Sequence, residues 1–140
     1  MSQFFIQFDD TGKGRATGWA ADWAFHVAAH SDYGHMAIGL EDYKAMTGRG
    51  HEYSFDLEKG IVKKKPLSIL ADKPSFAGDS KDRVTITWPV AKPLNVRING
   101  IPLTNNPHEG GLILTWDQQQ RLLIDVDDYE YIGQLTIEAT

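Results

Sequence analysis

The chain has 140 residues, of which 41% are hydrophobic and 24% charged, so it can form one ordinary globular domain or two small ones. No apolar run approaches the ~20 residues of a membrane helix, and the net charge of -5 with no basic face argues against nucleic-acid binding. We therefore expect a soluble protein that binds neither membranes nor nucleic acid.

Two further features narrow the cellular setting. The first ten residues, MSQFFIQFDD, have no basic segment and no small-residue cleavage site, so they do not resemble a signal peptide. The chain contains no cysteine, which excludes disulfides, a thiolate nucleophile and cysteine zinc sites. Both features fit synthesis in a reducing cytoplasm.

The first half of the chain predicts a mixture of strands and helix. A hairpin is expected over residues 3–19, because Gly12 and Gly14 allow the positive φ of a tight turn. Residues 40–47 predict a short helix, with acidic residues in the first turn and Gly48 placed to end it. A strand over 53–57, a turn and a basic segment then lead to Pro66, the expected domain boundary.

The second half predicts a small antiparallel sandwich of short strands. The seven expected strands are Leu67–Ala71, Val84–Trp88, Leu94–Ile98, Ile101–Leu103, Leu112–Trp116, Arg121–Val126 and Leu135–Glu138. Asn99-Gly100 is the strongest hairpin signal, since both positions tolerate the positive φ of a type I′ turn. Period-two alternation places Trp88 on the buried face, so we expect it in the core.

The stretch FHVAAHSDYGH, residues 25–35, holds three of the five histidines and raises the question of a metal site. If the stretch is helical, His26 and His30 share one face and could bind a metal with His35 or Asp32. If it is a strand, His26 and His30 lie about 13 Å apart. A metalloprotease motif would need a glutamate where Val27 stands, so we interpret the histidines as surface or interface residues and expect no metal or cofactor.

The other candidate chemistries also lack a signature. No GxSxG motif exposes a serine nucleophile, and adjacent aspartates on a strand point to opposite faces rather than forming an acid/base pair. Asp125, Asp127 and Asp128 lack the glycine and distal glutamate of a calcium loop. The residues therefore predict no catalytic group, and we expect that the protein is not an enzyme.

Two segments carry a family resemblance. IGLEDYKAMTGRGHEYSFDLEKGIVKKKP, about a fifth of the chain, resembles a segment common in tail fibre and tail-fibre assembly proteins of tailed bacteriophages. LSILADKPSFAGDSKDRVTITW with NVRINGIPL resembles the start of immunoglobulin-like modules in phage and bacterial surface proteins, and GQLTIEAT resembles their closing strand.

The resemblance implies a mainly β fold, with a small α+β docking unit over residues 1–65 and an immunoglobulin-like antiparallel β-sandwich over residues 66–140. It further implies a structural protein of the virion, in the tail, baseplate or fibre apparatus, made in the host cytoplasm. Its partners would be other phage structural proteins and copies of itself. We expect the edge strands and the aromatic residues Phe4, Phe5, Trp19 and Trp23 to form these contacts.

Three alternatives remain open. A tail-fibre assembly chaperone would share the first resemblance but would leave the finished particle. A histidine metal hydrolase would use His26, His30 and His35. A carbohydrate-binding module would stack sugar rings on Trp116, Tyr129 or Tyr131.

Overall fold

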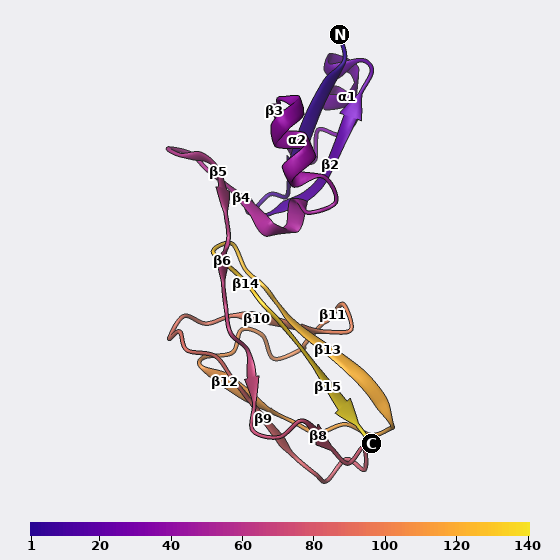
Figure 1. Ribbon diagram of the computed structural model, residues 1–140, viewed down its shortest axis with the longest axis vertical. Coiled ribbons are helices and arrows are strands. Elements are labelled where there is room, and N and C mark those ends of the chain that lie inside the picture. Colours follow the sequence, from indigo (N-terminus) through magenta and orange to yellow (C-terminus); the bar gives the residue numbers. More distant parts are fainter. The chain divides into compact units, whose positions relative to one another are not determined.

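The computed structural model describes residues 1–140 and confirms a mainly β chain, with two short α-helices and several antiparallel sheets (Figure 1). The chain divides into two compact units, residues 1–64 and residues 65–140. The boundary expected from the sequence lay between residues 65 and 66. Neither α-helix has the length and apolar character needed to cross a membrane.

The N-terminal unit is built on a three-stranded antiparallel sheet in the order β2-β1-β3. Its strands are β1 (Gln3–Phe8), β2 (Gly14–Ala20) and β3 (Gly34–Ile38). The predicted hairpin between β1 and β2 is confirmed, and its turn is held by the Asp9 carboxylate, which accepts hydrogen bonds from the backbone N–H groups of Thr11 and Lys13 at 2.9 Å each. β3 was not predicted.

The N-terminal unit also contains two short α-helices. Helix α1 (Trp23–Ala29) begins where the Asp22 carboxylate accepts a hydrogen bond from the Phe25 N–H, an N-cap that decides the helix-or-strand question left open by the sequence. Helix α2 (Leu40–Met46) confirms the predicted helix and carries two acidic residues in its first turn.

The rest of the unit is a short 3-10 helix and a hairpin. The 3-10 helix η1 (Gly50–Glu52) leads into β4 (Tyr53–Asp56), which pairs antiparallel with β5 (Gly60–Lys63). Gly60, the first residue of β5, has a positive φ of 79°. The strand β4 was predicted, whereas β5 was expected only as an exit segment.

The C-terminal unit contains two main sheets. The order β11-β10-β13-β15-β8 joins β11 (Ile101–Pro102), β10 (Asn95–Ile98), β13 (Gln120–Asp127), β15 (Gln134–Ala139) and β8 (Ser75–Phe76). The order β12-β9-β7 joins β12 (Gly111–Leu114), β9 (Val84–Thr87) and β7 (Leu70–Ala71). A further parallel pair is formed by β6 (Lys65–Pro66) and β14 (Tyr131–Ile132).

One hydrophobic cluster is shared by both sheets of this unit. Alternate residues of β9, β10, β13 and β15 enter it, so each strand has one buried and one more exposed face, which the sequence predicted for β9 and β10. Trp88 is 5% exposed, which confirms its predicted place in the core. The predicted hairpin at Asn99-Gly100 is confirmed by φ values of 52° and 81°.

Candidate functional site

The structure brings the three histidines of the sequence motif together on the N-terminal unit. Their rings lie among Phe5 and Trp23, and these five residues are called the aromatic–histidine cluster below. The ring centroid of His26 lies 4.5 Å from that of His30, 5.1 Å from that of His35 and 4.4 Å from that of Phe5. Of the three histidines, His30 is exposed, whereas His26 and His35 are half-buried.

Three elements position the cluster. His26 lies on α1 and His30, one turn later, is the C-cap residue of that helix, whereas His35 lies on β3 opposite Gln7 of β1. The Phe5 ring fits because β2 carries Gly18 beside it: a Cβ at Gly18 would lie 2.7 Å from the Phe5 ring. The packing of α1 beside the sheet thus depends on a glycine in the neighbouring strand.

A polar chain fixes the orientation of His35. The Arg15 guanidinium donates to Oε1 of Gln7 at 2.6 Å, which turns the Nε2 amide group of Gln7 toward Nε2 of His35 at 2.9 Å. An amide nitrogen can only donate, so Nε2 of His35 accepts and the ring proton lies on Nδ1. Arg15 also lies 4.0 Å above the ring centroid of Tyr33, which holds the guanidinium in place.

The surroundings of His35 disfavour its charged form. Burial lowers the pKa of His35, and repulsion from His26 and His30 in their charged forms lowers it further; the nearby Tyr33 carbonyl opposes the shift. That carbonyl does not complete a hydrogen bond, because Nδ1 of His35 and Nε2 of His26 are both buried without a partner. Protonation would add charge to a site that already holds unsatisfied polar atoms.

The same geometry argues against a metal. The structure contains no group of three His, Asp or Glu side chains arranged to hold an ion. The hydrogen bond from Gln7 occupies Nε2 of His35 and leaves the proton on Nδ1, so neither ring nitrogen offers a free lone pair to a metal. His35 is therefore not placed to act as a metal ligand.

The aromatic residues predicted to contact partners differ in exposure. Trp19 is 55% exposed and available, whereas Phe5 is only 6% exposed and cannot offer surface to another protein. Phe4 is half-buried and stacks on Tyr43 with ring centroids 4.5 Å apart, and Trp23 is half-buried in the cluster. Phe25, which was not selected from the sequence, is 72% exposed because it lies on the outer face of α1.

The aspartates weighed as a calcium site are engaged in other interactions. Asp125 pairs with Arg97 at 2.6 Å, and Asp128 pairs with Lys92 at 2.9 Å. Burial raises the pKa of Asp128, but hydrogen bonds from Lys92 and from the backbone N–H groups of two following residues outweigh it, so the net pKa is lowered. Asp128 therefore organises the turn after β13 as a charged group.

The aromatic residues considered for sugar binding are mostly packed. Trp116 and Tyr131 lie against the core of the C-terminal unit, and the Trp116 indole N–H donates to Gln120 at 3.0 Å. Tyr129 is 37% exposed. These residues do not form a shared platform of exposed rings.

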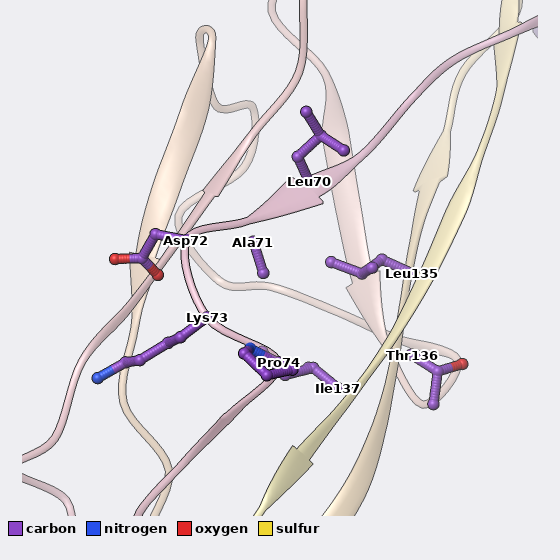
Figure 2. Close-up of a pocket in the computed structure, with 8 residues that line it drawn as sticks. All are labelled: Leu70, Ala71, Asp72, Lys73, Pro74, Leu135, Thr136 and Ile137. Atoms are coloured by element: carbon purple, nitrogen blue, oxygen red, sulfur yellow. The ribbon is translucent and has the colours of Figure 1, made fainter.

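A groove of about 380 Å³ lies in the C-terminal unit between β15 and the segment that follows β7 (Figure 2). It is lined mostly by apolar side chains, including Leu70, Ala71, Pro74, Leu135 and Ile137. Asp72, Lys73 and Thr136 complete its lining.

No protein-family model, curated protein or solved structure matches the chain.

Proposed function

We propose that the chain is a non-enzymatic structural component of a tailed-phage virion, in the tail, baseplate or fibre apparatus. It acts by binding other proteins of the particle and copies of itself. The proposal rests on the two sequence segments that resemble tail-fibre proteins and surface immunoglobulin-like modules, and the mainly β fold is compatible with it.

The observation that supports it most is the strand order of the C-terminal unit. An immunoglobulin-like sandwich places strands A, B and E in one sheet and strands C, F and G in the other. Assigning A, B, C, E, F and G to β7, β9, β10, β12, β13 and β15 in chain order reproduces these two sets. The first strand also changes sheets, because β8 pairs parallel with β15 at the opposite edge. We therefore propose an immunoglobulin-like module for this unit.

Mass spectrometry of purified particles tests the proposal. The genome that encodes this chain should yield virions in which its peptides occur at a stoichiometry of whole copies per particle. Peptides confined to the lysate and lacking in the particles would instead identify an assembly chaperone. As a control for the enzymatic alternative, the purified chain should carry far less than one equivalent of zinc after dialysis.

A further inference from the structure

Helix α1 is held on the sheet by a small number of ring contacts. None of its seven residues is fully buried, and a helix of this length is not stable on its own. Trp23 of α1 lies 5.9 Å from the ring centroids of both Phe5 and His35. His26 contacts the same two rings. The position of α1 therefore depends on the state of His35.

The orientation of the Gln7 amide group suits only a neutral His35. Gln7 is 5% exposed, and its Oε1 atom accepts a hydrogen bond from the Arg15 guanidinium. Its amide nitrogen, a donor, therefore faces Nε2 of His35 at 2.9 Å. Turning the amide over would place that nitrogen against the Arg15 guanidinium, which also can only donate. Because a protonated His35 carries an N–H on both ring nitrogens, it would direct a second donor at the Gln7 amide.

The other groups around His35 do not compensate a positive charge. Burial lowers the pKa of His35, the charges of the other two histidines lower it further, and the Tyr33 carbonyl opposes the shift. The groups around the ring are basic or uncharged: His26 on α1, His30 at its C-cap, Arg15 on β2, Tyr33 before β3, and Gln7 and Phe5 on β1. No carboxylate among them pairs with a charged His35.

We infer that Arg15, Gln7 and His35 form a proton-sensitive latch, a set of side chains that holds helix α1 on the sheet only while His35 is neutral. When His35 gains a proton, its Nε2–H and the Gln7 amide repel each other. Helix α1 then separates from the sheet, while the β1–β2 hairpin stays paired. The inference goes beyond the proposed function, since it concerns a change within the N-terminal unit and requires no partner.

NMR spectroscopy of the full-length chain during an acid titration tests the latch in the native protein. We expect His35 to titrate below pH 6.5, the ordinary value for histidine. Nuclear Overhauser effects between the rings of Phe5 and His26, whose centroids lie 4.4 Å apart, should be lost over the same pH range. A midpoint of His35 at or above 6.5, or ring contacts that persist after His35 is protonated, would overturn the inference.

Gln7→Glu tests the role of the amide orientation. A carboxylate at this position can accept hydrogen bonds from both Arg15 and a protonated His35, so the His35 midpoint should rise by about one pH unit or more. Helix α1 should then stay on the sheet at the pH at which the native chain releases it. Gln119→Glu is the matched control, because it adds the same charge at an exposed position of the C-terminal unit and should titrate like the native chain. An unchanged His35 midpoint in Gln7→Glu would refute the latch.

His35→Gln keeps the inference testable if Gln7→Glu does not fold. This variant cannot gain a proton at position 35, so the contacts between the rings of Phe5 and His26 should persist on acidification. Loss of these contacts at the same pH as in the native chain would show that another group releases α1, and the inference would be wrong.

Discussion

The two units differ in what holds them together. The C-terminal unit contains a cluster of fifteen buried side chains contributed by two sheets, whereas the corresponding cluster of the N-terminal unit contains three buried residues, Ile6, Phe8 and Ile38. The N-terminal unit adds half-buried aromatic rings and the aromatic–histidine cluster around this small centre. The C-terminal unit is therefore stabilised mainly by burial of apolar side chains. The N-terminal unit depends more on contacts in which polar and titratable side chains take part.

The largest expected effect comes from truncating a core residue in each unit. Leu122→Ala in β13 should destabilise the C-terminal unit by about 2–5 kcal/mol and leave it folded, whereas Ile6→Ala should unfold the N-terminal unit because fewer buried neighbours remain. Urea unfolding followed by circular dichroism measures both effects. Leu123→Ala is the matched control on the same strand, since Leu123 is 39% exposed and its removal should change stability little. An equal decrease in the free energy of unfolding of both units would contradict the proposed difference between their cores.

A smaller effect is expected where glycines allow two backbones to approach. A Cβ at Gly78 would collide with the Gln118 carbonyl, and a Cβ at Gly14 would collide with the Gly50 carbonyl. Gly78→Ala and Gly14→Ala should each cost about 1–3 kcal/mol, as overpacking does.

Gly39→Ala is the control for both substitutions, because nothing lies within 4 Å of a Cβ at that position. Thermal unfolding provides the readout. We expect Gly14→Ala to lower the melting temperature of the N-terminal unit and Gly78→Ala to lower that of the C-terminal unit. Unchanged melting of either glycine variant would show that the backbone can separate there without cost.

The sequence revealed much of the C-terminal unit because its signals are local. Alternation of Val84, Ile86 and Trp88 identified β9, and Asn99-Gly100 identified the β10–β11 hairpin. The two-residue strands β8 and β14 escaped prediction. Each forms a parallel pair with a segment more than fifty residues away, and no local pattern encodes that pairing.

The aromatic–histidine cluster was less predictable for a similar reason. The spacing of His26 and His30 implied a shared face only if the segment was helical, and the Asp22 N-cap was the local signal that could have decided it. The position of His35 depends on β3 pairing with β1, which the sequence did not indicate. The burial of Phe5 was missed because residues 4–8 are apolar on both faces of the strand apart from Gln7.

The smallest predicted effect is a pH dependence confined to the N-terminal unit. The pKa of His35 is lowered by folding, so the unfolded chain takes up a proton at higher pH than the folded chain. The stability contribution of neutral His35 is complete above the ordinary histidine pKa of 6.5 and is lost as the pH falls below that value toward the folded pKa. Urea midpoints of the N-terminal transition should therefore fall on acidification through this range.

Two variants isolate the source of that effect. His35→Gln should reduce the acid sensitivity, whereas His51→Gln should retain it, because His51 is exposed on η1. Both variants retain His26 of α1, the C-cap residue His30 and Arg15 of β2, which acts through Gln7. These groups set the charge around the site. The same acid sensitivity in His35→Gln and the native chain would assign the effect to another group.

Amide hydrogen exchange on the intact chain, read by mass spectrometry at neutral and mildly acidic pH, tests most directly whether each unit is held by its own core. We predict strong protection of β13 and β15 at both pH values, with weaker protection of β1 and β3 that falls further on acidification. Uniform protection across all four strands that changes together with pH would contradict it, because the chain would then unfold as a single cooperative unit.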